Sequence, residues 1–307
     1  MKNKQLIPLS IAGTALAAFG GCSFMLASNT VHGKRQTADE AMRWQSEHYD
    51  TAFYDRLEKT DYTIKSYDGY ELHVQLCKNP DPPSSGSRYV IISHGYTDNH
   101  IGMLKYMPMY LEAGFHCILY DLRGHGENAP FVCSYGIREA RDLHVLVEDT
   151  FARYGSSVTL GLHGESLGAA TTVTSLQYHQ NIAFAVADCS FSEITNVLKI
   201  AFSKWHLPGL FVRSASVCSR LMYGYSFTEI RPIDALRDNQ VPLLLIHGEN
   251  DRFIIPQNSM DLMDANPGYS ELLLVPGAKH ANSVLTDPDL YREKLLSFLT
   301  DVLKEPE

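Results

Sequence analysis

The sequence predicts an α/β fold: a mostly parallel sheet with helices on both faces and a short helical cap. Short apolar runs such as Arg88–Ser93 and Leu243–Ile246 alternate with longer amphipathic stretches such as Ile137–Tyr154. Strands that are buried on both faces are typical of parallel sheets covered by helices. An aromatic-rich stretch in the second half of the chain interrupts this alternation and predicts the cap.

Composition limits the classes of function. The chain has 307 residues, of which 45% are hydrophobic and 20% are charged, and its formal net charge is -9. An acidic surface repels phosphate backbones, so we expect no nucleic-acid partner. The six cysteines include no C-x-x-C pair, so no metal site of the zinc type is predicted.

Residues 1–30 are predicted to be a membrane anchor or signal segment. Lys2 and Lys4 precede the uncharged stretch Gln5–Asn29. A bilayer core needs about 20 apolar residues, whereas the core of a cleaved signal peptide has about 7–15. The length favours an uncleaved anchor, and the two lysines would keep the N-terminus in the cytoplasm and the rest of the chain outside it.

Three alternatives for this segment stay open. Ala15-Leu16-Ala17 resembles a signal-peptidase site, which would give a secreted protein, and Gly20-Gly21-Cys22 resembles a lipoprotein cleavage site. A buried helix of a soluble protein is the third. Residues 31–60 would then be a polar, partly helical tether, and residues 61–307 the main domain.

The main domain is predicted to open with two strands, Asp61–Ser66 and Tyr70–Cys77, joined at the hairpin turn Asp68-Gly69. Further strands are expected at Arg88–Ser93, His116–Tyr120, Val158–Leu162, Phe184–Ala187, Leu243–Ile246 and Glu271–Val275. Helices are expected at Met103–Ala113, Ile137–Tyr154, Leu167–Tyr178, Asn258–Met263 and Asp289–Leu303.

A cap insertion is expected at about residues 192–230. About 55 residues separate Ala187 from Leu243, more than one crossover connection needs. The stretch Ile194–Tyr225 is aromatic-rich and helical in pattern. We expect it to cover the carboxyl ends of the strands, where open α/β sheets bind ligands. A packing insertion without any role toward a substrate is the alternative.

Gly164-Glu165-Ser166-Leu167-Gly168 is a G-x-S-x-G pattern between a predicted strand and a predicted helix. In this context the serine occupies a strained strand-to-helix turn, and the flanking glycines relieve crowding around it. The following helix directs its N-terminal N–H groups toward the serine's surroundings. Ser166 is therefore the predicted nucleophile, against a plain tight turn as the alternative.

A serine hydroxyl needs a base, and the base needs an acid that orients it. His280 lies in the loop between the last predicted strand and the last predicted helix, which makes it the candidate base. Asp251 follows the preceding strand and is the candidate acid, with Glu249 as its nearest rival. The order serine, acid, histidine is the one expected for this arrangement on a parallel sheet.

The oxyanion that forms during attack needs two N–H donors. One is expected from the main chain of Leu167, directly after Ser166. The other is expected from the main chain of Tyr96, in the loop after Arg88–Ser93, where His94 would shape the turn. Asp121–Gly126, which follows another strand, is interpreted as an ion-paired turn that supports the site.

These motifs together resemble the α/β-hydrolase superfamily over about Tyr62 to Leu303. The matching motifs are H-G at His94, D-x-R-G-H-G from Asp121, G-x-S-x-G around Ser166, G-x-x-D ending at Asp251, and the His280 loop. Within the superfamily the chain looks most like membrane-anchored bacterial and Bem46-like serine hydrolases, and it is similar to serine aminopeptidase-type hydrolases. The resemblance implies the residue roles given above and no metal or organic cofactor.

The expected function is a serine hydrolase that cleaves a small-molecule acyl ester or thioester through an acyl-enzyme. An apolar, aromatic cap favours an acyl group. A peptidase or amidase, with Glu193 or Glu229 holding a free amine, is the first alternative, and a non-catalytic binding protein is the second. The expected location is the membrane, through the N-terminal helix, with the catalytic domain outside the cytoplasm. The sequence does not identify a protein partner.

Overall fold

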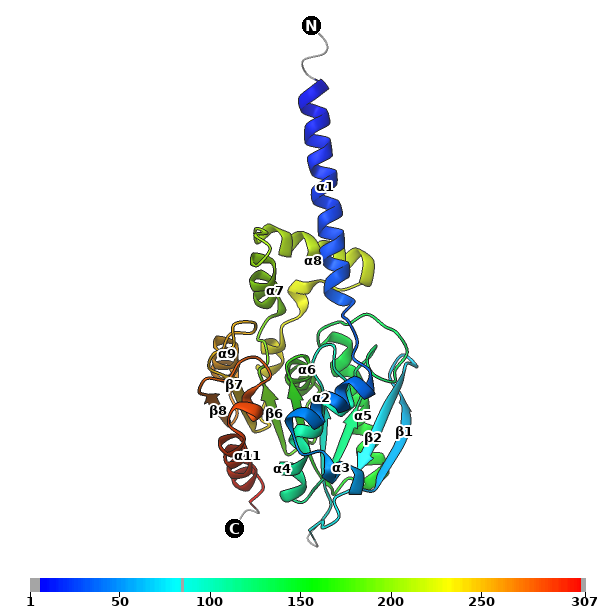
Figure 1. Ribbon diagram of the computed structural model, residues 1–307, viewed down its shortest axis with the longest axis vertical. Helices are drawn as coiled ribbons and strands as arrows, with labels where there is room; N and C mark the ends of the chain where they lie inside the picture. Colours follow the sequence, from blue (N-terminus) through cyan, green and yellow to red (C-terminus); the bar gives the residue numbers. More distant parts are fainter. Residues whose placement is uncertain (1–5, 84–85, 305–307) are drawn as a thin grey trace.

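The computed structural model describes residues 6–83 and 86–304, with side chains from residue 17 onward. Its centre is an eight-stranded sheet in the order β1-β2-β4-β3-β5-β6-β7-β8, in which β2 pairs antiparallel with β1 and β4 and all other pairs are parallel. The strands are β1 Lys59–Lys65, β2 Glu71–Cys77, β3 Arg88–Ser93, β4 Phe115–Tyr120, β5 Thr159–Glu165, β6 Phe184–Asp188, β7 Leu243–Gly248 and β8 Ser270–Val275. The predicted mostly parallel sheet is confirmed (Figure 1).

Helices connect and cover these strands. The α-helices are α1 Leu6–Val31, α2 Ala38–His48, α3 Ala52–Arg56, α4 Met107–Glu112, α5 Ile137–Tyr154, α6 Leu167–Ser175, α7 Ile194–Ser203, α8 Leu210–Tyr223, α9 Gln257–Ala265, α10 Ser283–Thr286 and α11 Pro288–Val302. Short 3₁₀ helices are η1 His100–Tyr106, η2 Leu176–Tyr178, η3 Phe227–Glu229 and η4 Pro232–Leu236. The predicted helix over 103–113 thus begins as η1 and becomes α-helical only at α4, whose first turn accommodates Pro108.

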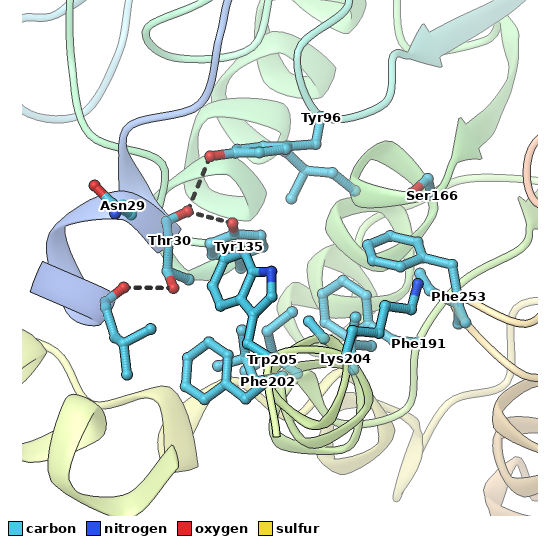
Figure 2. Close-up of a pocket in the computed structure, with 17 residues that line it drawn as sticks. Asn29, Thr30, Tyr96, Tyr135, Ser166, Phe191, Phe202, Lys204, Trp205 and Phe253 are labelled. Carbon is cyan, nitrogen blue, oxygen red and sulfur yellow. Dashed lines mark hydrogen bonds between the residues drawn. The ribbon is translucent and has the colours of Figure 1, made fainter. Parts of the chain in front are cut away.

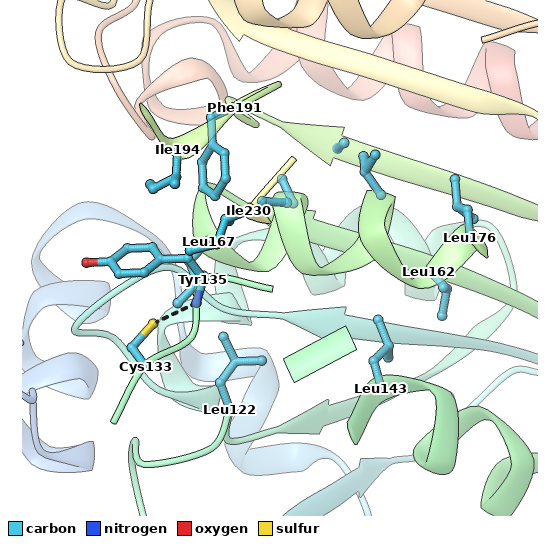
Figure 3. Close-up of a cluster of buried hydrophobic side chains, with 14 of the residues drawn as sticks. Leu122, Cys133, Tyr135, Leu143, Leu162, Leu167, Leu176, Phe191, Ile194 and Ile230 are labelled. Carbon is cyan, nitrogen blue, oxygen red and sulfur yellow. Dashed lines mark hydrogen bonds between the residues drawn. The ribbon is translucent and has the colours of Figure 1, made fainter. Parts of the chain in front are cut away.

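Two hydrophobic clusters cover the two faces of the sheet, because successive side chains of a strand point to opposite faces. In β3, Ile91 belongs to one cluster and Val90 to the other. The first cluster includes Leu143 of α5 and reaches Leu167, directly after the candidate nucleophile (Figure 3). The second includes Phe298 of α11. Both faces are therefore covered, as the apolar strands predict.

Residues 31–60 pack against the main domain through α2 and α3. The Gln36 N–H donates to the Thr97 carbonyl at 2.8 Å, and Gln45 Nε2 donates to the Gly102 carbonyl at 3.0 Å. Tyr54 is buried, and its hydroxyl donates to Gln75 of β2. This segment covers the loop that follows β3.

Helix α1 packs through its C-terminal half and extends away from the rest of the chain beyond α8 (Figure 1). Ser23 Oγ donates to Ser214 Oγ of α8 at 2.7 Å, and the rings of Phe19 and Phe211 lie 4.8 Å apart. Among the described residues, no helix is both long and apolar enough to cross a membrane. The predicted anchor over 1–30 lies in part outside the described residues.

Between β6 and β7 the chain forms α7 and α8, the helices expected for the cap. In Figure 1 both helices lie above the sheet, at the end of the molecule where α1 projects. Val197, Leu198 and Phe202 of α7 are buried. The same helix lines a pocket that contains Ser166, so this insertion lies beside the candidate nucleophile.

Candidate active site

The backbone at Ser166 has the strained geometry that the G-x-S-x-G pattern predicts. Ser166 follows β5 and precedes α6, with φ 53° and ψ -110°, a conformation that costs a non-glycine residue on the order of 1–3 kcal/mol. A Cβ atom added at Gly164 would lie 2.2 Å from the Gly168 carbonyl oxygen, and one at Gly168 would lie 2.0 Å from that of Ser93. Both flanking positions therefore require glycine.

The three side chains predicted for the triad lie in hydrogen-bonding contact. Ser166 Oγ is 3.0 Å from His280 Nε2, and His280 Nδ1 is 2.7 Å from Asp251 Oδ2. Asp251 follows β7 and His280 follows β8, so neighbouring parallel strands deliver them to the same edge of the sheet. The rival acid Glu249 is exposed, and Asp251 takes the predicted position.

Asp251 is held as a carboxylate. Its Oδ1 accepts the main-chain N–H groups of Phe253 and Ile254 at 2.8 and 3.0 Å. Burial alone would raise the pKa of Asp251, but the hydrogen bonds from His247 and His280 lower it well below its usual range. A buried carboxylate at His280 Nδ1 fixes the imidazole with Nε2 directed toward Ser166.

The loop after β3 lies next to Ser166, as the predicted oxyanion donors require. A Cβ atom at Gly95 would lie 3.7 Å from the Cβ of Ser166. Within the described part of the chain, the main-chain N–H groups of Tyr96 and Leu167 donate to no main-chain carbonyl. Both donors are therefore available to a negative charge that develops near Ser166.

His94 holds this loop in place. Its Nε2 accepts the Leu122 N–H at 2.9 Å, so its Nδ1 carries the proton and donates to the Gly95 carbonyl at 2.7 Å. Burial, and then the nearby His125, lower the pKa of His94 to about 3. His94 is thus a neutral imidazole that ties the oxyanion loop to the turn after β4.

That turn, Asp121–Gly126, is ion-paired, as its sequence predicts. Arg123 is fully buried and donates to Asp142 and Asp68. Asp121 accepts from His100 Nδ1 at 2.9 Å and lies 3.3 Å from His73 Nδ1. The hydrogen bond to Asp121 raises the pKa of His73 despite the half-buried position of the imidazole. The turn supports the loop that His94 holds.

His73, His100 and Asp121 are, among the described residues, the one group close enough to share a metal ion. The carboxylate of Asp121 already accepts the main-chain N–H groups of His100 and Glu127 at 2.8 and 2.9 Å. Burial would raise the pKa of Asp121, but the hydrogen bonds from His100 and His73 lower it strongly. The Asp121 carboxylate is thus surrounded by hydrogen-bond donors of this chain, namely two main-chain N–H groups and the neighbouring imidazoles.

Buried polar groups also contact the main chain of Ser166 and the side chain of the preceding residue. Its N–H donates to the Asp188 carbonyl oxygen at 2.8 Å. The preceding Glu165 is 2.5 Å from Lys105 Nζ and accepts from the Tyr106 hydroxyl at 2.6 Å. Burial, and then the charge of Glu165, raise the pKa of Asp188 to about 6. These contacts hold Glu165 and the main chain of Ser166 in place.

An apolar cavity of about 360 Å³ opens beside Ser166 (Figure 2). Its size lies within the range of small-molecule sites. Phe191, Leu198 and Phe202 form part of one wall. Phe253 lies next to Ser166 in this view and packs edge-on against His280, with ring centroids 5.0 Å apart.

The other wall comes from α1, which sequence reasoning did not place at the site. Leu26, Asn29 and Thr30 line the cavity. The hydroxyls of Tyr96 and Tyr135 both donate to the Thr30 carbonyl, at 2.9 and 2.5 Å (Figure 2). Only the assembled fold shows this contact, because hydropathy alone marks 1–30 as a segment apart from the main domain.

Comparison with known proteins places the chain in a family. Residues 90–294 match the alpha/beta hydrolase family. The chain is 27% identical to the uncharacterized protein YqkD of Bacillus subtilis, over 97% of this chain and 98% of that protein.

Among solved structures, the fold is similar to the Pyrococcus furiosus esterase Pf2001, with a TM-score of 0.66 and 20% identity over 82% of this chain and 95% of the esterase. It is also similar to a Pyrococcus horikoshii acylaminoacyl peptidase, with a TM-score of 0.63 and 16% identity over 84% of this chain and 44% of the peptidase. These two similarities concern the fold alone. With its eight-stranded sheet and its match over most of the main domain, the chain belongs to the alpha/beta hydrolase family.

Proposed function

We propose that this chain is a serine hydrolase that cleaves an acyl ester or thioester. The observation that carries the proposal is the hydrogen-bonded chain from Ser166 Oγ through the His280 imidazole to Asp251, with distances of 3.0 and 2.7 Å. A nucleophile, a base and an orienting acid in this geometry are what acyl transfer requires. Membership of the alpha/beta hydrolase family and the esterase and peptidase among its structural neighbours support a hydrolase activity.

In the proposed mechanism, Ser166 Oγ attacks the acyl carbonyl carbon while His280 Nε2 takes its proton. The tetrahedral oxyanion is stabilised by the main-chain N–H groups of Tyr96 and Leu167. His280 then gives the proton to the leaving alkoxide or thiolate, which leaves the acyl group on Ser166. Water, deprotonated by His280, attacks this acyl-enzyme; the bond from the acyl carbon to Ser166 Oγ then breaks, His280 returns the proton to Oγ, and the acid is released. Asp251 stabilises the imidazolium in both halves of the reaction.

The pocket supports an acyl substrate. Its wall is formed by apolar side chains such as Phe191, Leu198 and Phe202, which favour a hydrocarbon chain. The carboxylates considered for binding a free amine are both ion-paired: Glu193 with Arg231 and Glu229 with Arg220. Neither carboxylate lines the pocket that contains Ser166. These contacts favour the esterase over the aminopeptidase alternative.

A fluorophosphonate probe tests the proposal, because it reacts covalently with an activated serine. We expect stoichiometric labelling at Ser166, hydrolysis of p-nitrophenyl acyl esters, and slower or no hydrolysis of aminoacyl amides. Faster turnover of the amides would favour the peptidase alternative. A folded chain that neither labels nor turns over any ester would favour the non-catalytic alternative.

Asp251→Asn is expected to lower kcat by about 10⁴-fold, less than loss of the nucleophile does, because the acid orients the imidazole and does not attack. An amide at this position can present its NH₂ to His280 Nδ1, which favours the wrong tautomer. Steady-state kinetics on p-nitrophenyl butyrate measures the change. Glu249→Gln, at an exposed carboxylate two residues earlier, is the control and should keep wild-type kcat. Equal loss in both variants would contradict the role of Asp251.

Ala201→Trp is expected to shorten the acyl chain that the enzyme accepts. Ala201 is a half-buried residue of α7 that lines the pocket, and an indole there would occupy the space of an acyl chain. We expect kcat/KM to fall about 10-fold or more for a long-chain ester, while that for an acetyl ester changes little. Ala265→Trp, at a half-buried alanine of α9 outside this pocket, is the matched control. A uniform loss across all chain lengths would argue against this pocket as the acyl site.

The proposal also places the enzyme at a membrane, held by residues 1–30 with the catalytic domain outside the cytoplasm. The uncharged stretch after Lys2 and Lys4 supports this orientation. Protease added to intact spheroplasts should then digest the catalytic domain. Full protection there, with digestion only after lysis, would contradict the orientation, and recovery of the domain in the medium would favour a cleaved form.

A further inference from the structure

We infer that the outer face of the cap docks on an anionic lipid bilayer. This docking face consists of Lys204, Trp205, Leu210, Arg213, Val217 and Leu221, from the end of α7 through α8. The inference concerns a surface outside the triad and holds whether or not Ser166 is a nucleophile. One consequence, the path of the acyl chain, rests on the proposed function.

The docking face is apolar and open to solvent. Trp205 is 64% exposed, Val217 60% and Leu221 77%. On α8, Leu210, Arg213, Val217 and Leu221 recur every three or four residues, so they share one side of the helix. Residues on the opposite side of α8, which are Val212, Ala215, Ser216 and Ser219, are buried. One side of α8 therefore packs against the rest of the molecule. The other side carries large apolar residues that ordinarily lie in a core, and it faces solvent.

Charge distinguishes this face from the rest of the molecule. Residues 194–223 contain four lysines and arginines and no aspartate or glutamate, although the whole chain carries a formal net charge of -9. Arg220 pairs with Glu229. Within the described residues, Lys204 and Arg213 have no carboxylate partner. Trp205 lies in the turn that precedes α8. An amphipathic helix with basic residues and a nearby exposed tryptophan is typical of a segment that lies in a lipid interface, and anionic headgroups complement its charge.

Helix α1 lies next to the docking face, and its position indicates what the face contacts. Phe24 and Met25 of α1 are 50% and 64% exposed, next to Ser23, which contacts α8. Figure 1 shows α8 lying across α1 at the point where α1 leaves the body of the molecule. Helix α1, which carries no charged residue, and the docking face thus lie at the same end of the molecule. This arrangement favours a bilayer over a protein partner.

The docking face also adjoins the substrate pocket. Lys204 and Trp205 line the cavity that contains Ser166 (Figure 2), and Trp205 is largely exposed. The wall of the cavity therefore reaches the surface at the docking face. If Ser166 is the nucleophile, an acyl chain can pass from the bilayer into the pocket without crossing water, which makes an acyl ester of a membrane lipid the substrate class.

The fluorescence of Trp205 can report docking. The chain has two tryptophans, Trp44 and Trp205, so replacing Trp44 leaves Trp205 as the single emitter. The Trp44→Phe variant of the full chain is reconstituted into phosphatidylcholine vesicles with and without one quarter phosphatidylglycerol. Compared with the vesicles of phosphatidylcholine alone, we expect the Trp205 emission in the anionic vesicles to lie at shorter wavelength. Lipids brominated on their acyl chains should quench this emission in the anionic vesicles. Unchanged emission and no quenching in vesicles that carry the protein would overturn the inference, since the proposed anchor, residues 1–30, would then hold the chain alone or a protein partner would cover the docking face.

Charge reversal provides the second arm. Lys204→Glu with Arg213→Glu, in the Trp44→Phe background, should weaken the docked state by about fivefold for each charge, seen as a loss of quenching. Arg56→Glu with Lys65→Glu, at exposed residues of α3 and β1, is the matched control and should leave quenching unchanged. Equal quenching in both double variants would overturn the role of the anionic lipid.

Ser166→Ala in the Trp44→Phe background separates this inference from the proposed function. It should dock as the parent variant does. Fluorophosphonate labelling of the wild-type chain in detergent tests the nucleophile without any membrane, so failure of labelling and failure of docking are independent results.

Discussion

Replacement of Ser166 by alanine is expected to abolish both fluorophosphonate labelling and ester hydrolysis, while the chain stays folded. The loss in kcat should be on the order of 10⁶-fold, larger than the loss expected for Asp251→Asn, because what remains without the nucleophile is substrate binding and the oxyanion donors. His280→Ala should cost a similar factor, since Ser166 Oγ then has no base at 3.0 Å. The two residues act in one step, so the double variant should be little worse than either single one.

Kinetics on p-nitrophenyl butyrate, mass spectrometry of the labelled peptide, and thermal unfolding measure these outcomes. Ser46→Ala, at an exposed serine of α2, is the control and should keep full activity and labelling. Retention of more than about a thousandth of wild-type kcat in a verified Ser166→Ala preparation would contradict the assignment of the nucleophile. Losses for Ser166→Ala and His280→Ala that multiply in the double variant would contradict their action as one unit.

Arg123→Ala is expected to lower the free energy of unfolding by about 3–5 kcal/mol, the largest effect on stability that we predict. The Arg123 guanidinium is fully buried and makes a two-pronged contact with Asp142, which is also fully buried. Its removal leaves the Asp142 carboxylate without a counter-charge in a dry environment. Arg123 also donates to Asp68 in the β1–β2 turn, so the same change loosens that hairpin.

Urea unfolding of the two variants decides whether burial of the pair is the reason. Arg292→Ala is the matched control, because it breaks a pair with Glu112 whose two side chains are 48% and 43% exposed. An exposed pair is worth about 0–1 kcal/mol. Arg123→Met combined with Asp142→Leu should recover most of the lost stability, because no buried charge then remains unpaired. Similar losses for Arg123→Ala and Arg292→Ala would contradict this account.

Several parts of the site could be predicted from the sequence because each depends on local chemistry. The G-x-S-x-G pattern at Ser166 needs only a strand, a tight turn and a helix in succession, all of which leave periodic signals. Asp251 and His280 follow short apolar runs that predict strands, of which β7 is fully buried and β8 is a half-buried strand at the edge of the sheet. Some strand boundaries differ from the prediction: β5 runs to Glu165, beyond the predicted end at Leu162, since the chain stays extended up to the turn that carries Ser166.

Other parts required contacts between distant segments. Helix α1 has the hydropathy of a separate segment, yet Thr30 accepts hydrogen bonds from Tyr96 and Tyr135 and lines the pocket. The sequence allows Glu193 or Glu229 to bind an amine, but in the structure Glu193 is paired with Arg231 and Glu229 with Arg220. Neither a period nor a motif encodes such pairings.

The sequence by itself determined the class of fold, the strand order along the chain and the identity of the candidate nucleophile, acid and base, because hydrophobic periodicity and turn chemistry are local properties. Only the tertiary structure decided that residues of α1 and of the cap line the pocket at Ser166, and that Arg213 lies on the outer face of α8 without a carboxylate partner among the described residues. Those features depend on side chains that are far apart in the chain and that meet only after the sheet has brought its loops to one edge.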